Sequence, residues 1–317
     1  MAEYKAIRGH TIRTIAGDAS PLVLGDIWYS NTTKKIRGAK LGAGAWSTGG
    51  NLTTARTTTG AGTQTAAIAA GGYSTTQVGI VETYDGSSWT EIADLNTARD
   101  RGVGIGIQTA SLHAGGHPAP AVRDIVESWN GTSWTEVGDF NTGRYWHGGA
   151  GTNTAALVFL GTPGYVAIAE SWDGSSWTEV GDLNDGRYSA GGGGTQTSAI
   201  ASGGASAPVV GNTETWDGSS WTEVSNLNTA RYGLEVVATD STSALAFGGT
   251  PPVKDETEEW DGSSWTEVAD LSTARVEPMG AGTQPSALCI GGASWPTVYN
   301  NVEEWTKAVA ASSFTSS

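Results

Sequence analysis

Six arginine residues recur along the sequence at nearly constant spacing, and each closes a short phrase such as LNTAR or LSTAR. A ring of guanidinium groups could bind anions or acidic sugars, because arginine makes bidentate hydrogen bonds to carboxylates and phosphates. Six glutamates recur in step with the arginines, each two residues before an aromatic residue. A catalytic centre breaks the symmetry of a repeat, whereas these twelve residues keep it, so we predict a structural ring of ion pairs or glutamate-to-backbone bonds. The residues are Arg56, Arg99, Arg144, Arg187, Arg231, Arg275, Glu82, Glu127, Glu170, Glu214, Glu258 and Glu303.

Aromatic side chains are the second group with binding chemistry, because a flat apolar ring with a polar edge suits sugars. Eleven of the 14 tryptophans occupy repeat positions and are expected in the core. Trp28, Trp146 and Trp295 fall outside the repeat and are predicted to lie at the surface. The ligand-binding candidates are Tyr73, His117, Trp146, Tyr165 and Trp295.

Patterns of catalysis and metal binding are missing from the sequence. His113 and His117 have the spacing of metal ligands on a helix, but this stretch is predicted to be strand and loop, with no neighbouring acid or cysteine pair. No P-loop, H-E-x-x-H motif or Ser-His-Asp constellation is found. We therefore expect no catalytic residue, no metal and no cofactor, and we predict that the chain is not an enzyme.

The recurring residues belong to one tandem repeat, which six tryptophans mark at spacings of 43, 45, 43, 44 and 44 residues. A glycine doublet recurs in every copy except the third, where Gly161-Thr162 stands in its place. Such a period is typical of solenoids and propellers, in which each repeat is one supersecondary unit. The six tryptophans are Trp46, Trp89, Trp134, Trp177, Trp221 and Trp265.

Each repeat is predicted to form four short antiparallel strands. In the first full copy we expect strands over residues 57–62, 66–70 and 79–84, and a fourth that begins at Trp89. The Asp-Gly pair at residues 85–86 supplies the positive φ of a hairpin turn. A sheet of this size buries both faces only by packing beside its neighbours around an axis. We therefore predict an all-β fold, a six-bladed β-propeller over residues 43–307.

The two ends of the array predict how the ring is closed. The first repeat-like residues, around Trp46, match a fourth strand, and the last, around Trp305, match a third strand. The sixth blade must therefore take its fourth strand from the N-terminal side, which removes the open sheet edge. We predict that the segment around Trp46 pairs with the segment around Trp305.

The segments between the second and third strands differ most among the repeats, and all are expected on one face of the ring. Variable loops on a rigid scaffold suit recognition, although drift in unconstrained loops gives the same pattern. The segments are residues 73–77, 117–120, 162–165, 205–208, 250–253 and 293–296.

The formal net charge is −15, which argues against nucleic-acid binding. Residues 1–42 hold seven basic and three acidic residues, a net charge of +4, so the rest of the chain carries −19. The basic arm indicates docking on an acidic partner. The simpler explanation for the acidic charge of the remaining residues is that it keeps the protein soluble.

The single cysteine, Cys289, lies in an apolar run and is expected in the core. No signal peptide and no run of 18 apolar residues is seen, so we expect no membrane insertion.

The order of a glycine doublet, an aromatic residue and then a tryptophan resembles the kelch repeat over about residues 44–306. The Trp-Asp dipeptide at three positions is also similar to WD40 repeats, but no Gly-His opens each unit, so a kelch-like repeat is preferred. The sequence SWDGSSW at residues 171–177 is similar to the Asp-box of sialidases, although it lacks the residue that this box has between aspartate and glycine.

Residues 24–38 form a separate predicted hairpin, which resembles segments of phage tail-fibre and other virion proteins. With the repeated WDGSSWTEV sequence, the chain resembles kelch-like structural proteins of tailed, especially marine, phages. The resemblance implies a virion structural or appendage protein that attaches to other virion proteins through residues 1–42 and contacts a host surface, with residues 308–317 as a flexible tail. The alternative is an extracellular or cytoplasmic glycan-binding propeller, and a sialidase-like hydrolase is the least favoured.

Overall fold

The computed structural model describes residues 13–117 and 124–313, and every regular element in these ranges is a β-strand. No helix suited to crossing a membrane occurs among these residues. The chain divides into two compact units, one formed by Ala45–Thr306 and the other by Met1–Gly44 with Lys307–Ser317.

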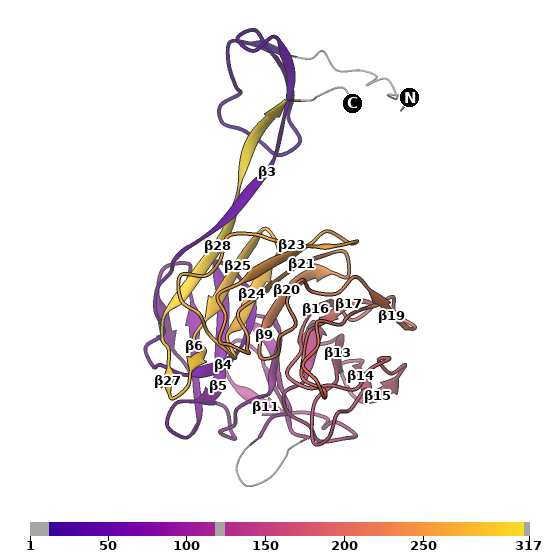
Figure 1. Ribbon diagram of the computed structural model, residues 1–317. Coiled ribbons are helices and arrows are strands. Elements are labelled where there is room, and N and C mark those ends of the chain that lie inside the picture. Colours follow the sequence, from indigo (N-terminus) through magenta and orange to yellow (C-terminus); the bar gives the residue numbers. More distant parts are fainter. Residues whose placement is uncertain (1–12, 118–123, 314–317) are drawn as a thin grey trace. The chain divides into compact units, whose positions relative to one another are not determined.

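The larger unit is built from six antiparallel blades, and in five of them four consecutive strands pair in chain order (Figure 1). Their inner strands contact one another in the order β4, β8, β12, β16, β20 and β24, and β24 in turn contacts β4. The predicted all-β, six-bladed propeller is confirmed. The five sheets are β4 (Thr57–Thr63), β5 (Ala66–Tyr73), β6 (Gln77–Tyr84) and β7 (Trp89–Glu91); β8 (Val103–Ile107), β9 (Ala110–Ala114), β10 (Val126–Trp129) and β11 (Trp134–Glu136); β12 (Gly148–Gly151), β13 (Ala156–Phe159), β14 (Ala169–Trp172) and β15 (Trp177–Val180); β16 (Gly191–Thr195), β17 (Ser198–Ser202), β18 (Thr213–Trp216) and β19 (Trp221–Val224); and β20 (Glu235–Asp240), β21 (Ser243–Phe247), β22 (Thr257–Trp260) and β23 (Trp265–Glu267).

The sixth blade joins segments from both ends of the chain. It contains β24 (Met279–Thr283), β25 (Ser286–Ile290), the first part of β28 (Val302–Ser313) and the last part of β3 (Lys35–Thr48), in that order. A short hairpin, β26 (Ala293–Ser294) and β27 (Thr297–Val298), lies between β25 and β28 in the sequence. The predicted pairing around Trp46 and Trp305 is confirmed, because β3 and β28 are neighbours in the sheet and the two indole rings lie 5.4 Å apart.

Trp46 also makes the contacts with the preceding blade that other fourth-strand tryptophans make. Its ring meets Phe247 edge-on at 5.1 Å, as the ring of Trp221 meets Phe159 at 5.0 Å. Its Nε1–H donates to the hydroxyl of Thr257 at 3.0 Å. The N-terminal strand therefore completes the sixth blade with the same side-chain packing as a strand encoded inside a repeat.

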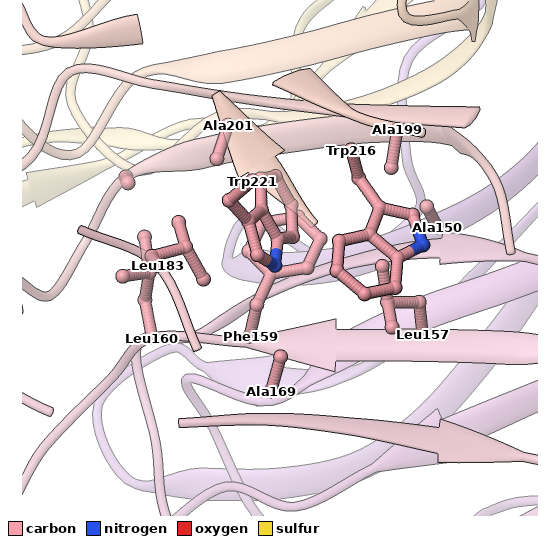
Figure 2. Packing of buried hydrophobic residues seen from close by; sticks show 11 residues of the cluster. Ala150, Leu157, Phe159, Leu160, Ala169, Leu183, Ala199, Ala201, Trp216 and Trp221 are labelled. Carbon is pink, nitrogen blue, oxygen red and sulfur yellow. The ribbon is translucent and has the colours of Figure 1, made fainter. Parts of the chain in front are cut away.

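The core between blades consists of aromatic rings packed on small and branched residues. Figure 2 shows Trp216 and Trp221 of the fourth blade packed against Leu157 and Phe159 of β13 in the third. All four side chains are buried. Truncating a buried aromatic residue of this kind costs about 3–5 kcal/mol, because neighbouring groups cannot close the cavity. Cys289 is buried in an equivalent cluster, as expected from its apolar surroundings in the sequence.

The glycine doublet joins each blade to the next. Gly203 has a φ of +67°, and a Cβ there would lie 2.5 Å from the carbonyl oxygen of Arg231 in the following blade. The N–H of Gly204 donates to that same oxygen at 2.8 Å. Six such bonds, 2.8–3.3 Å long, run from Gly72 to Arg99, Gly116 to Arg144, Gly161 to Arg187, Gly204 to Arg231, Gly249 to Arg275 and Gly292 to Arg56.

The third repeat keeps this geometry without a doublet, and the register assigned to it from the sequence was wrong. Leu160, not Gly161, occupies the first doublet position, with a left-handed φ of 67°. Gly161, not Thr162, takes the second position and donates its N–H to Arg187 at 2.9 Å. Leu160 is fully buried in the core, so its packing offsets the backbone strain of a non-glycine residue in this conformation.

The smaller unit contains β1 (Arg13–Ile15) and β2 (Ile27–Ser30) beside the remaining parts of β3 and β28. The hairpin predicted over residues 24–38 is observed, with Ile27 opposite Gly38. The surface position predicted for Trp28 is wrong, because its ring is buried and its Nε1–H donates to the carbonyl oxygen of Gly17 at 3.2 Å. Residues 308–313 of the predicted flexible tail belong to β28, and the Arg37 guanidinium donates to the carbonyl oxygen of Ala311 at 3.3 Å.

In four blades the turn between the third and fourth strands contains the same carboxylate motif, at Asp85, Asp173, Asp217 and Asp261. In the first blade, Oδ1 of Asp85 accepts the N–H groups of Ser87 and Ser88 at 2.9 and 2.8 Å. These bonds and the Ser87 hydroxyl lower the pKa of Asp85 to about 2. The second blade has Asn130 at this position, and its amide oxygen accepts two N–H groups in the same way. An amide can therefore replace the carboxylate without loss of the turn.

A variant with Asp85→Asn, Asp173→Asn and Asp217→Asn is expected to fold normally and to lose less stability in acid. All three carboxyls have a folded-state pKa of about 2, below the ordinary value of 3.8. Their stabilisation is complete above the ordinary value and is lost as the pH falls through the folded pKa. Thermal unfolding between pH 5 and about pH 2 measures the effect.

The matched control is Asn130→Asp, which adds a fourth carboxylate to an equivalent turn. This variant should steepen the fall of Tm in acid. An identical acid dependence in the wild type, the triple variant and the control would contradict the role assigned to these turns.

Candidate ligand-binding site at the channel mouth

The six repeat arginines are engaged inside the fold. Arg187 and Glu214 form an ion pair with 2.7 Å between Nη1 and Oε1, and both side chains are fully buried. The Arg187 Nε–H also donates to the carbonyl oxygen of Gly203 at 2.9 Å. The second carboxylate oxygen of Glu214 accepts the N–H of Asn184 at 2.8 Å. The pairs are Arg56–Glu82, Arg99–Glu127, Arg144–Glu170, Arg187–Glu214, Arg231–Glu258 and Arg275–Glu303.

A second ring of six residues lies two positions after these arginines, and its members differ in chemistry. We name this set the mouth ring. Four successive backbone bonds of 2.7–2.8 Å run around it, from the N–H of Trp146 to Arg101, Ser189 to Trp146, Gly233 to Ser189 and Glu277 to Gly233. The mouth ring comprises Thr58, Arg101, Trp146, Ser189, Gly233 and Glu277.

Four non-glycine members of the mouth ring have left-handed backbone conformations. Their φ values are 59° at Arg101, 53° at Trp146, 56° at Ser189 and 52° at Glu277. Each such conformation costs about 1–3 kcal/mol and persists only where the surrounding structure enforces it, often at functional sites. The ring therefore combines a repeated, strained backbone with side chains that break the symmetry of the repeat.

The mouth ring is interrupted in the first blade. There the inner strand begins at Thr57, and the Thr58 hydroxyl donates to the carbonyl oxygen of Ala70 at 3.2 Å. Within residues 13–117 and 124–313, no backbone bond links Thr58 to Arg101 or to Glu277. Arg101 and Glu277 therefore flank the interruption, one on each side.

A hollow of about 70 Å³ lies at this ring. Three buried groups here are only weakly engaged: Nε of Arg101 lies 3.5 Å from Asp100, the Trp146 indole lies beside the Glu277 carboxyl, and the His147 ring lies beside the Ala114 backbone. Burial lowers the pKa of His147 to about 3, with the charge of Arg144 adding to the shift, so its ring is neutral at physiological pH. The hollow is lined by Arg101, Gly102, Trp146, His147, Ser189, Ala190, Gly233, Leu234 and Glu277.

Two carboxyl groups accompany the single guanidinium at the hollow. Nε of Arg101 lies 3.5 Å from Oδ2 of Asp100, whose side chain is buried. Burial raises the pKa of Glu277, while the Arg101 guanidinium opposes the rise. Burial also raises the pKa of Asp100, again opposed by Arg101.

Aromatic rings continue outward from the mouth ring as a stack. The Arg101 guanidinium lies 4.6 Å from the ring centroid of Trp146. Trp146 stacks on Tyr188 at 5.4 Å, and Tyr188 stacks on Tyr165 at 5.8 Å, with interplanar angles of 22° and 20°. Tyr165 ends the stack, and the residue is 53% exposed.

The five ligand-binding candidates predicted from the sequence fall into two groups. His117, Trp146 and Tyr165 are brought together through Tyr145 and Tyr188, which sequence reasoning missed. Tyr73 and Trp295 form a separate edge-to-face pair at 5.7 Å, in which Trp295 is 48% exposed. The tyrosine that follows the repeat arginine in three copies was the available signal.

His113, which the sequence analysis considered as a metal ligand, does not belong to a metal-binding cluster among the described residues. His113 is buried, and its Nδ1 lies 2.8 Å from the Thr59 hydroxyl. Among the residues with described positions, no cluster of three or more histidine, cysteine, aspartate or glutamate side chains could hold a metal. Residues 118–120 of the second variable loop, and the N-terminal part of the predicted arm, residues 1–12, lie outside the described ranges.

Comparisons with known proteins support the propeller fold. No family model matches the chain, and no curated protein matches it. A solved structure titled "Structure of YjhT" superposes with a TM-score of 0.69 at 14% sequence identity, covering 83% of this chain and 99% of that one. At this identity the similarity shows the fold alone. The chain is thus a β-propeller protein, while its kelch-like and phage-like resemblances stay predictions.

Replacing Arg187 by alanine is expected to destabilise the fold by about 3–5 kcal/mol, because the change leaves the Glu214 carboxylate buried without its counterion. The control is Lys254→Ala, which removes a partly exposed partner of Glu256 and should cost less than about 1 kcal/mol. Urea unfolding of both variants measures the difference. Equal losses of stability in the two variants would contradict the stabilising role assigned to the buried Arg187–Glu214 ion pair.

Proposed function

We propose that this chain is a non-enzymatic recognition protein whose propeller binds a glycan at the mouth ring. The observation that carries the proposal is the stack of Arg101, Trp146, Tyr188 and Tyr165, which ends in an exposed ring on a variable loop. Rigid aromatic faces bind the apolar faces of sugars with little loss of conformational entropy. A glycan-binding propeller was the alternative interpretation of the sequence, and the contacts of these side chains favour it.

The rigidity of the site supports recognition. The Arg–Glu pairs bury their charges within the blades, and the mouth ring fixes the backbone of Trp146 and Ser189 by hydrogen bonds on both sides. The aromatic residues are held in place before a ligand arrives, which reduces the entropic cost of binding. Variable loops on such a scaffold can change specificity without changing the fold.

We further propose that the protein belongs to a virion and that residues 1–42 attach it to other virion proteins. This segment has a net charge of +4, in contrast to −19 for the remainder. Val23, Leu24, Ile27 and Ile36 of the smaller unit are exposed apolar side chains, which are typical of contact surfaces. The propeller would then present its loops to a host surface.

A glycan array tests the binding proposal. The wild-type chain is expected to bind a subset of glycans, and Tyr165→Ala is expected to weaken that binding about tenfold, which corresponds to about 1.4 kcal/mol. Trp295→Ala tests the second aromatic pair in the same way. Ile107→Ala is the control, because Ile107 is equally exposed but ends an inner strand away from the variable loops. Absence of binding by the wild type would end the proposal.

Immunogold labelling of purified particles tests the attachment proposal. An antibody against the propeller is expected to decorate virions at a fixed position. In the chain with Val23→Ser, Leu24→Ser and Ile36→Ser, the label should decrease because exposed apolar contacts are lost. Absence of the wild-type chain from purified particles would rule the location out.

A further inference from the structure

We propose that the hollow at the mouth ring is a subsite for the hydroxyl groups of a neutral sugar, and that Glu277 makes it reject sugars that carry a carboxylate. This inference rests on the proposed glycan-binding function and names the class of glycan. It follows from the hydrogen-bonding groups at the hollow, from their charges and from its size.

The donors at the hollow are only weakly engaged inside the fold. Nε of Arg101 lies 3.5 Å from Oδ2 of Asp100, the Trp146 indole lies beside the Glu277 carboxyl, and the His147 ring lies beside the Ala114 backbone. His147 is 5% exposed and lines the hollow, and its neutral ring offers one donor and one acceptor. Donors that lack a short internal hydrogen bond are available to a ligand group that accepts one.

Acceptors line the same hollow. Glu277 and Ser189 are members of the mouth ring, and the Glu277 carboxyl lies near both the Arg101 guanidinium and the Trp146 indole. A hydroxyl group both donates and accepts hydrogen bonds, so it matches a wall that mixes donors with acceptors. A carboxylate only accepts, and it would leave the Glu277 oxygens unmatched.

The charges favour a neutral ligand. Asp100 and Glu277 provide two carboxyl groups against the one guanidinium of Arg101, which already lies 3.5 Å from Asp100. The chain as a whole has a net charge of −15. A ligand carboxylate in the hollow would lie beside the Glu277 carboxyl, and two neighbouring carboxylates repel each other.

The size of the hollow limits what enters it. A hollow of about 70 Å³ has room for small polar groups such as one or two hydroxyls. The rest of the sugar would pack against the neighbouring aromatic stack. Trp146 belongs to both features, since it lines the hollow and stacks on Tyr188.

The experiment compares matched sugars on the full-length chain. Isothermal titration uses galactose- and galacturonate-terminated oligosaccharides of the same linkage, and glucose- and glucuronate-terminated pairs. The wild type is expected to bind the neutral member of a pair about tenfold or more tightly than its uronate. Glu277→Gln keeps the size and removes the charge, so it should reduce this ratio to below about threefold.

Two further variants keep the test decisive. Ser189→Ala should weaken neutral sugars several-fold while leaving the rejection of uronates in place, and it remains informative if Glu277→Gln does not fold. Glu91→Gln is the control, because Glu91 is an exposed residue of β7 and should leave the ratio unchanged.

The outcomes separate the two proposals. If the wild type binds no glycan, the proposed function fails and this inference fails with it. If the wild type binds glycans but accepts uronates equally well, or if Glu277→Gln and Ser189→Ala both bind as the wild type does, only the neutral-sugar inference is overturned.

Discussion

The buried repeat arginine is the residue on which the propeller depends, because it acts through two groups at once. Its guanidinium neutralises a glutamate of its own blade, as in Arg187 and Glu214 at 2.7 Å. Its carbonyl oxygen accepts an N–H from the preceding blade, as Arg187 accepts from Gly161 at 2.9 Å. A desolvated charge is tolerable only when it is paired and hydrogen-bonded, so the ion pair fixes the backbone that the neighbouring blade then recognises. Six copies of this residue thus join the folding of each sheet to its placement beside the next.

The repeat allowed the fold to be predicted, since spacing alone reveals which residues are equivalent. The strands expected over residues 57–62, 66–70 and 79–84 correspond to β4, β5 and β6, and Trp46 lies beside Trp305 as predicted. The errors concern features that residue type does not encode. Leu160 occupies a left-handed position that glycine fills elsewhere, because packing in the core overrides the local preference. Trp28 is buried, and residues 308–313 form a strand, through pairings distant in the sequence.

The candidate site was only partly predictable. His117, Trp146 and Tyr165 were recognised as aromatic or imidazole residues outside the repeat or in variable loops, and the structure joins them. The mouth ring was missed, because five of its six members share a backbone conformation and not a chemical type. Arg101, Ser189 and Glu277 look unrelated in the sequence, and only their common offset from the repeat arginine relates them. Comparing the repeats for the position of greatest chemical difference would have identified them.

The mouth ring is held by main-chain amides, from Arg101 through Trp146, Ser189 and Gly233 to Glu277. Its side chains therefore contribute little to keeping the scaffold together. Substitution at Arg101, Trp146, Ser189 or Glu277 alters the side chains that the mouth ring displays, while the main-chain bonds of the ring remain. A gene built from nearly identical repeats thereby gains a small set of codons, one in each copy, on which selection can act independently. Diversification of such a protein would proceed at those codons long before it reached the tryptophans or the paired charges.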